Sequence, residues 1–284
     1  MSNAITVKNV TKMFPTFTLD QVSFDLPQGC ILGLVGENGA GKSTTLRLIM
    51  NSLRADAGEV TVLGTDNRSP EFLAVKEDVG VVLDEAYFPE VLTVEQLEKV
   101  MQNTYRNWDA GVFWAYIQRF DLPRRKQQFK DFSRGMKMKL AIAVALSHAP
   151  KLLLLDEATS GLDPIVRDEI LTIFSEFTRE ESHSILLSSH IVSDLEKICD
   201  YIAFLHKGRL VLFSEKDRLL EEYAILSCTK AQVENLPEEA VLGREEGSYG
   251  VRALVRRALV SDVFPMERPT LEDIILFVAK GERK

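Results

Sequence analysis

One nine-residue segment restricts the possible folds of this chain more than any other. Residues 36–44 read GENGAGKST and fit the pattern GxxxxGK[ST], and they follow the apolar run at residues 31–35. Glycines let the backbone curl until successive N–H groups face inward, and the helix expected next adds positive potential. A chance match in a glycine-rich turn would not require a strand before it and a helix after it. The segment therefore predicts a phosphate-binding loop in an α/β protein.

The same loop supplies candidate contacts to a nucleotide. Lys42 is placed to reach the β- and γ-phosphates, and the Ser43 hydroxyl is placed to ligate Mg²⁺. We therefore expect ATP and Mg²⁺ as cofactors. The predicted ATP-binding residues of the loop are Asn38, Gly39, Ala40, Gly41, Lys42, Ser43 and Thr44.

Two carboxylates end a fully apolar run. LLLLDE places Asp156 and Glu157 at the carboxyl end of an expected strand, where open α/β sheets bind ligands. We expect Asp156 to hold Mg²⁺ through its coordinated water and Glu157 to orient and deprotonate the attacking water. A pair of solvated carboxylates at a strand end would explain these two residues taken alone. Beside a phosphate loop, the metal and general-base interpretation is preferred.

Strand and helix patterns alternate along most of the chain. Residues from about 86 to 147 are helical in composition and form an insertion between strands. This alternation predicts an α/β core with a helical subdomain inserted into it. After residue 217 the pattern changes to short strands and a last helix, for which Thr270 is the expected cap. We expect an ATPase domain at 1–217 and a small α+β accessory domain at 218–284.

Charge and cysteine content limit the partners and the compartment. The net charge is −8 and the pI is near 5.2, which disfavours nucleic acid because phosphate binding rewards basic surfaces. Cys30, Cys199 and Cys228 are far apart with no CxxC pair, which indicates reduced thiols. The N-terminus lacks a signal-peptide pattern, and no apolar run approaches the roughly 18 residues of a membrane span. We expect a cytoplasmic chain that does not itself cross a membrane.

A longer segment decides among the classes of nucleotide-binding protein. A phosphate loop with an acidic strand end fits kinases, GTPases and helicases equally well. Residues 133–164, SRGMKMKLAIAVALSHAPKLLLLDEATSGLDP, closely resemble the part of ABC ATPases that joins the signature motif, Walker B and the D-loop. The resemblance covers roughly residues 5–215, with the family's elements in order. It implies a P-loop NTPase core of the ABC type with a mixed sheet, and it extends to ATPases of bacterial ABC-2-type exporters, including those for bacitracin and other peptides.

The resemblance also implies a site shared between two chains. Ser133, Arg134 and Gly135 fall on the signature, which in this family faces the Walker A loop of a second ATPase subunit packed head to tail. The start of the helix there would offer a second positive helix end to the γ-phosphate. Taken alone, this segment would be an ordinary helix start with Ser133 as its cap.

Three further residues are assigned by the same resemblance. Asp163 falls in the D-loop, His190 falls on the switch histidine, and Phe14 falls where an aromatic ring stacks on adenine. Alone, His190 would more often be a hydrogen-bonded structural histidine and Phe14 a core or half-buried residue. The order and spacing of the motifs favour the functional assignment.

The chain departs from the family pattern at several positions. The usual LSGGQ is FSRGM here, with Arg134 and Met136 as replacements, and Ala158 stands where proline is common. Asp84 stands where the Q-loop glutamine is expected. We expect Asp84 to offer an anionic oxygen to Mg²⁺, which prefers hard oxygen ligands. The alternative is that Asp84 faces solvent beside Glu85 and that the loop senses nucleotide through backbone groups.

The resemblance implies a transport motor. MgATP would close a homo- or heterodimer of ATPase subunits, and the helical insertion would transmit this motion to a transmembrane permease subunit at the inner face of the membrane. One alternative is a soluble ABC ATPase acting on ribosomes or DNA, which the single ATPase domain and the roughly 120 residues from Gly36 to Asp156 disfavour. The other is a degenerate ATP-binding regulator, which intact Lys42, Glu157 and His190 disfavour.

Overall fold

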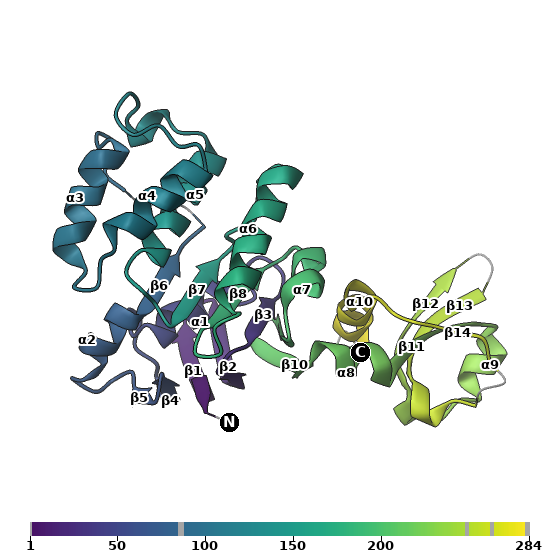
Figure 1. Cartoon of the computed structure of the whole chain (residues 1–284). Coiled ribbons are helices and arrows are strands. Elements are labelled where there is room, and N and C mark those ends of the chain that lie inside the picture. The colour runs from purple at the N-terminus through teal and green to yellow at the C-terminus, as the bar shows by residue number, and fades with distance from the viewer. Residues whose placement is uncertain (1, 85–87, 248–249, 262–263, 282–284) are drawn as a thin grey trace.

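The computed structural model describes residues 2–84, 88–247, 250–261 and 264–281 (Figure 1). Three sheets organise these residues: an N-terminal antiparallel sheet, a central six-stranded sheet and a C-terminal antiparallel sheet. The predicted α/β core with a mixed sheet is present. Residues 85–87, at the start of the predicted helical insertion, lie outside the described residues.

The central sheet has the strand order β10-β9-β3-β8-β7-β6, and only the edge strand β10 is antiparallel to its neighbour. Its inner strands are apolar on both faces because both faces are covered, as is usual for parallel sheets. Parallel strands end at the same edge, so the segments after β3, β7 and β8 lie together. The strands are β3 (Ile31–Val35), β6 (Val79–Val82), β7 (Leu152–Asp156), β8 (Ser184–Ser189), β9 (Tyr201–His206) and β10 (Arg209–Glu215).

The N-terminal sheet covers one face of the central sheet. A hydrophobic cluster joins its strands to α1 (Lys42–Ile49) and to β3, through residues such as Ile5, Leu19 and Leu34. The expected helix after the phosphate loop therefore forms, and it ends at Ile49. The strands are β1 (Asn3–Phe14), β2 (Phe17–Pro27), β4 (Ala57–Val62) and β5 (Thr65–Asp66).

Helices between β6 and β7 form the insertion seen on one side of the sheet in Figure 1. Each of its long helices begins at a residue whose side chain accepts a backbone N–H: Thr93, Asp109 and Ser133. The helices of the insertion are α3 (Val94–Thr104), α4 (Ala110–Arg119) and α5 (Arg134–Leu146). A short helix, α2 (Phe72–Val75), comes before β6 in the chain. Two more helices, α6 (Pro164–Phe177) and α7 (Val192–Ile198), follow β7 and β8.

The C-terminal sheet has the order β12-β13-β11-β14, and the predicted strands in residues 224–256 are part of it. The expected turn at 247–250 lies partly outside the described residues. The short α8 was not predicted and spans the proposed boundary at residue 217, so the division into domains stays a prediction. The elements are α8 (Lys216–Glu222), β11 (Tyr223–Cys228), α9 (Lys230–Glu234), β12 (Val241–Gly247), β13 (Gly250–Arg256), β14 (Met266–Glu267) and α10 (Leu271–Gly281).

The last helix, α10, connects the C-terminal part to the ATPase core. Thr270 caps it as predicted, accepting from the Asp273 N–H at 3.1 Å while Asp273 accepts from the Thr270 N–H at 3.1 Å. The helix packs on α7, where the Leu271 N–H donates to a Glu196 carboxylate oxygen at 3.3 Å. Its buried side chains Leu271 and Phe277 belong to the same hydrophobic cluster as residues of the central sheet.

The cysteines match the expectation of free thiols. Cys199 is buried, and Cys30 and Cys228 are half-buried. Burial raises the pKa of the Cys199 thiol well above its usual value, which keeps it protonated and unreactive. None of the helices in the described part of the chain combines the length and apolar character needed to cross a bilayer.

The packing of α10 can be tested with two neighbouring residues. Phe277→Ala removes a buried ring and should lower the free energy of unfolding by about 3–5 kcal/mol. Leu276→Ala, on the exposed side of the same helix, should change it by less than about 0.5 kcal/mol. Urea titrations followed by circular dichroism would measure both variants. Equal stability of the two would contradict the described packing.

Candidate nucleotide site

The phosphate loop lies between β3 and α1, as predicted, and its glycines are required by close packing. A Cβ atom on Gly36 would lie 2.5 Å from the Leu205 carbonyl oxygen. Gly41 has φ +112°, and a Cβ atom there would lie 2.7 Å from Leu19. The contact at Gly36 is with backbone, and the positive φ at Gly41 strains any residue with a side chain, so these two positions need glycine. The loop also rests on the β9–β10 turn, where the Gly208 N–H donates to the Ala40 carbonyl at 3.1 Å.

Lys42 crosses the loop rather than pointing to solvent. Its buried ammonium donates to the Gly36 carbonyl oxygen at 2.8 Å and to that of Glu37 at 3.4 Å. It also lies 3.2 Å from Glu157 Oε1, which forms an ion pair. A buried ammonium needs such partners because burial removes its hydration. Lys42 thereby joins the loop to the end of β7.

The two carboxylates after β7 have different environments. Asp156 is buried and accepts a hydrogen bond from Ser188 Oγ at 2.8 Å. Glu157 has φ +52°, an uncommon conformation for a residue with a side chain, and its N–H donates to the Ser188 carbonyl at 2.9 Å. Such strain persists only where the surroundings fix it, and it often occurs at functional sites. Here it turns the Glu157 side chain toward Lys42 and His190.

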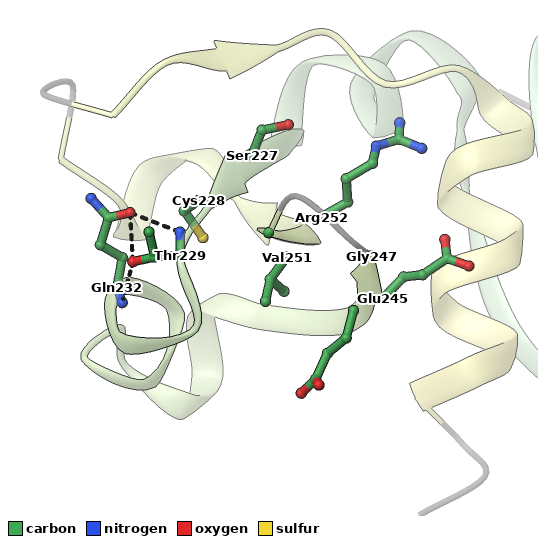
Figure 2. Close-up of a pocket in the computed structure, with 10 residues that line it drawn as sticks. Ser227, Cys228, Thr229, Gln232, Glu245, Gly247, Val251 and Arg252 are labelled. Carbon is green, nitrogen blue, oxygen red and sulfur yellow. Dashed lines mark hydrogen bonds between the residues drawn. The ribbon is translucent and has the colours of Figure 1, made fainter.

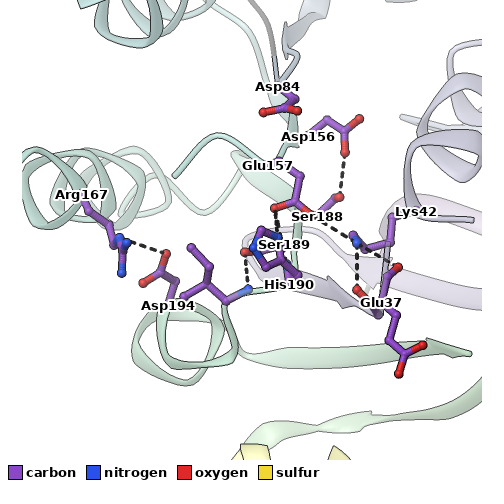
Figure 3. Close-up of polar contacts among 12 residues, drawn as sticks. Glu37, Lys42, Asp84, Asp156, Glu157, Arg167, Ser188, Ser189, His190 and Asp194 are labelled. Atoms are coloured by element: carbon purple, nitrogen blue, oxygen red, sulfur yellow. Dashed lines mark hydrogen bonds and ion pairs between the residues drawn. The ribbon is translucent and has the colours of Figure 1, made fainter. Parts of the chain in front are cut away.

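His190 contacts the other oxygen of the same carboxylate. Its Nδ1 lies 2.7 Å from Glu157 Oε2, and its backbone N–H donates to that oxygen at 3.4 Å (Figure 3). An ionised carboxylate only accepts hydrogen bonds, so Nδ1 carries the proton in this contact. Lys42 and His190 therefore hold the two oxygens of Glu157 from opposite sides. The sequence placed these three residues in one site, and the structure brings them into contact.

Two cavities open beside this group. One, of about 420 Å³, is lined by Phe17, by most of the phosphate loop, and by Asp84 and Glu157. The other, of about 780 Å³, is lined by Ser43, Asp84 and Asp156, by the polar side chains of Arg47, Ser52 and Lys76, and by apolar side chains. The three predicted metal ligands thus share one cavity. Phe14 is not among the residues that line either cavity, and its ring centroid lies 6.2 Å from that of Phe17.

The signature and the D-loop lie at the starts of α5 and α6, and Arg134 of the signature contacts Asp84, which lines both cavities. Ser133 caps α5 by accepting from the Met136 N–H at 3.2 Å, as its local interpretation predicts. Asp163 caps α6 in the same way, accepting two backbone N–H groups at 3.0 and 3.1 Å. Gly135 lies within 4.0 Å of Leu162 of the D-loop, measured from where its Cβ would be. None of the signature residues or Asp163 lines either cavity.

Sequence reasoning missed several contacts around the site. Ser188 had one available signal, since it is a serine near the end of a fully buried strand whose middle is apolar. Arg167 donates to the Leu162 carbonyl at 3.4 Å and lies 3.9 Å from the buried Asp194 of α7 (Figure 3). Arg134 forms an ion pair with Asp84 at 2.7 Å, and no local sequence pattern relates these two residues.

A further cavity of about 660 Å³ lies in the C-terminal sheet, far from the phosphate loop (Figure 2). The charged side chains that line it are already ion-paired. Glu245 pairs with Lys280 at 3.1 Å, and Arg252 pairs with Asp273 at 3.5 Å. Glu246 likewise lies 3.2 Å from a lysine. This cavity therefore has little charge with which to select a ligand.

Comparisons with known proteins agree with this site. The family model described as ABC transporter matches residues 19–160. The chain is 32% identical over 206 residues to the ABC transporter ATP-binding protein YtrB of Bacillus subtilis, covering 72% of this chain and 69% of that protein. It is 35% identical over 214 residues to the bacitracin transport ATP-binding protein BcrA of Enterococcus faecalis, covering 74% and 69%. The lantibiotic transport ATP-binding protein SrtF of Streptococcus pyogenes is 32% identical over 213 residues, covering 74% and 90%.

Solved structures agree on the fold. A structure described as the ATP-binding subunit of an ABC transporter superposes with a TM-score of 0.68 at 27% identity, covering 76% of this chain and 91% of that one. A dimeric ATP-binding cassette bound to ADP and Pi gives a TM-score of 0.65 at 23% identity, covering 74% and 98%. The second likeness concerns the fold alone.

The phosphate loop, the acidic end of β7 and the histidine after β8 define an ATP-binding P-loop ATPase. The extent of the family match makes the assignment narrower: this chain belongs to the ABC transporter family. It is an ATPase whose hydrolysis of ATP is coupled to transport, as the sequence predicted.

The bond from Ser188 to Asp156 can be tested locally. Ser188→Ala leaves a buried carboxylate without one donor and should lower the free energy of unfolding by about 1.5–3 kcal/mol. Ser189→Ala is the control, because its hydroxyl is equally buried but accepts from a backbone N–H, a neutral bond worth about 1 kcal/mol. Chemical denaturation at neutral pH compares the two. A Ser188 variant as stable as the parent would show that the bond does not support Asp156.

Proposed function

We propose that this chain is the MgATP-driven motor subunit of an ABC exporter, working as a head-to-tail dimer on a separate transmembrane permease subunit. One observation carries the proposal. Glu157 is held by Lys42 and His190 beside the phosphate loop, whereas the signature residues lie outside the two cavities of that site. A second ATPase subunit would then supply a signature to the nucleotide.

The predicted loop residues would bind the ATP phosphates through backbone N–H groups and the Lys42 ammonium. Six of them line the cavity of about 420 Å³, and the seventh, Ala40, is buried against the β9–β10 turn. Phe17 lines the same cavity, so the adenine ring would stack in the region of Phe14 and Phe17. The exposed fraction of the Phe14 ring leaves it available for that contact.

The donor set beside the loop fits Mg²⁺. Ser43, Asp156 and Asp84 line one cavity and offer only oxygen atoms, which this hard cation prefers. The described residues contain no group of three acidic, histidine or cysteine side chains able to hold a metal unaided, so water and phosphate oxygens would complete its coordination. When bound, the ion would neutralise charge on the β- and γ-phosphates.

Glu157 would act as the general base, and His190 would orient it. The Nδ1–H of His190 donates to Oε2 at 2.7 Å and the Lys42 ammonium lies 3.2 Å from Oε1, so both oxygens of the carboxylate are held in place. The carboxylate would then accept a proton from the attacking water at the edge of the phosphate cavity. Asp163 would position the D-loop at the contact with the second subunit.

Replacement of Glu157 tests this role. Glu157→Gln keeps shape and hydrogen bonding but removes basicity, so hydrolysis should fall by about two orders of magnitude or more. ATP binding should survive, and ATP-dependent dimers should accumulate on size-exclusion chromatography. Glu180→Gln, on an exposed turn, is the control and should retain parental turnover. Near-parental turnover of Glu157→Gln would remove it as the base.

Mixing two inactive variants tests whether the site is shared. Lys42→Ala should lose ATP binding, and Gly135→Trp should bind ATP but not hydrolyse it. One of the two sites in a mixed dimer would combine an intact loop with an intact signature, so phosphate release should partly recover. If activity stays at the level of either variant and no ATP-dependent dimer forms, a shared site is contradicted.

The membrane partner would dock beside the Asp84 loop. The cavity of about 780 Å³ exposes apolar surface there, and Val81 and Leu83 are 38% and 42% exposed. A permease segment on this surface would contact the loop that leads into the helical insertion. The transport names of the relatives BcrA and SrtF support peptide export, which would place this chain at the inner face of the membrane. Co-purification with an integral membrane protein tests this arrangement.

A further inference from the structure

Two positions that depart from the family pattern contact each other. Asp84 replaces the Q-loop glutamine and Arg134 replaces the first signature glycine, and they lie 50 residues apart in the sequence. Arg134 Nη2 donates to Asp84 Oδ1 at 2.7 Å. Each departure alone would disturb the family's site, but together they place opposite charges side by side.

The Arg134 guanidinium is also supported by the D-loop. A Cβ atom on Gly161 would lie 2.9 Å from Nη1 and 3.0 Å from Cζ of Arg134, so the guanidinium rests directly on this glycine. Gly161 has φ +69°, a conformation that itself favours glycine. Arg134 thus contacts the loop after β6 on one side and the D-loop on the other, which limits the positions its side chain can take.

Asp84 faces the nucleotide site of its own chain. It lines both cavities, and in the larger one it is joined by Ser43 and Asp156. Arg134 lines neither cavity. The ion pair occupies Oδ1, and a carboxylate has a second oxygen with which to coordinate a cation. Arg134 therefore holds this carboxylate from outside the site.

We propose that Arg134 is a positioning residue that acts within its own chain, by holding the Asp84 carboxylate toward the Mg²⁺ side of the ATP site. This rests on the proposed function, in which Asp84 ligates Mg²⁺. The pair is half exposed, with side-chain exposures of 52% and 51%, so it contributes little to stability and its role is orientation. The signature at the start of α5 would face the nucleotide of the partner subunit. Through Arg134, the same helix contacts Asp84, which would ligate Mg²⁺ in its own chain.

The test measures Mg²⁺ binding by separate chains. Binding of a fluorescent ADP analogue is titrated with Mg²⁺ at protein concentrations where size exclusion shows monomers. Arg134→Gln should raise the Mg²⁺ concentration for the half-maximal effect by about tenfold, the lower end of the loss expected when an outer partner of a metal ligand is removed. Affinity for the Mg²⁺-free analogue should stay unchanged, and Arg134→Lys should restore part of the loss.

A matched ion pair serves as the control. Arg119 pairs with Glu176 at the same 2.7 Å and with similar exposure, 39% and 37%, far from the nucleotide loop. Arg119→Gln should leave the Mg²⁺ titration unchanged. The double variant Asp84→Asn with Arg134→Gln should shift the Mg²⁺ titration by the same amount as Asp84→Asn alone. The reason is that Arg134 acts on the ion only through the Asp84 carboxylate. Additive effects would overturn the proposal.

Two other outcomes separate this proposal from the proposed function. If Arg134→Gln overlays the parent titration while Asp84→Asn shifts it, Arg134 does not position Asp84, and Asp84 remains a ligand. If neither variant shifts the titration, Asp84 is not a metal ligand, which overturns both this proposal and that part of the proposed function. Because separate chains bind ADP without a partner's signature, a role of Arg134 in the partner's site cannot move this titration.

Discussion

The carboxylate of Glu157 is the point on which the rest of the site depends. Its strained backbone, φ +52°, is held where β7 ends, because its N–H bonds to the carbonyl of Ser188 on the neighbouring strand. The parallel order β3-β8-β7 brings the loop, the histidine and the acidic pair to one edge. Lys42 and His190 can then reach the two carboxylate oxygens. With a different strand order, these three residues would not lie at neighbouring strand ends.

Much of this arrangement could be predicted because its signals are local in the sequence. The glycine loop, the acidic strand end and the Thr270 cap each lie within a few residues, and the structure contains all three local features. The contacts that could not be predicted join residues far apart: Ser188 with Asp156 across 32 positions, and Arg134 with Asp84 across 50. Such pairs depend on how elements pack, which sequence periodicity does not specify.

The short helix α7 is where the ATPase core and the C-terminal part meet. It begins at Val192, two residues after His190, and its buried Asp194 lies 3.9 Å from Arg167, whose guanidinium donates to the D-loop carbonyl of Leu162. Its Glu196 accepts from the first N–H of α10 and, through its carbonyl, from Lys216. The segment that carries the histidine is therefore packed on the D-loop side and on the C-terminal side. The described residues of the C-terminal part line neither cavity, but they pack on the helix that follows the histidine.

Burial separates the fixed parts of the site from those that can move. Lys42, Asp156 and Glu157 are buried, and removing a partner from a buried charge is costly unless a ligand atom replaces that partner. The Asp84–Arg134 pair is half exposed, and water can replace either partner at small cost. It joins two segments, the loop entering the helical insertion and the start of the signature helix, that a closing dimer must reposition. Because breaking this ion pair costs little free energy, the helical insertion can move while the Glu157 side chain keeps its position.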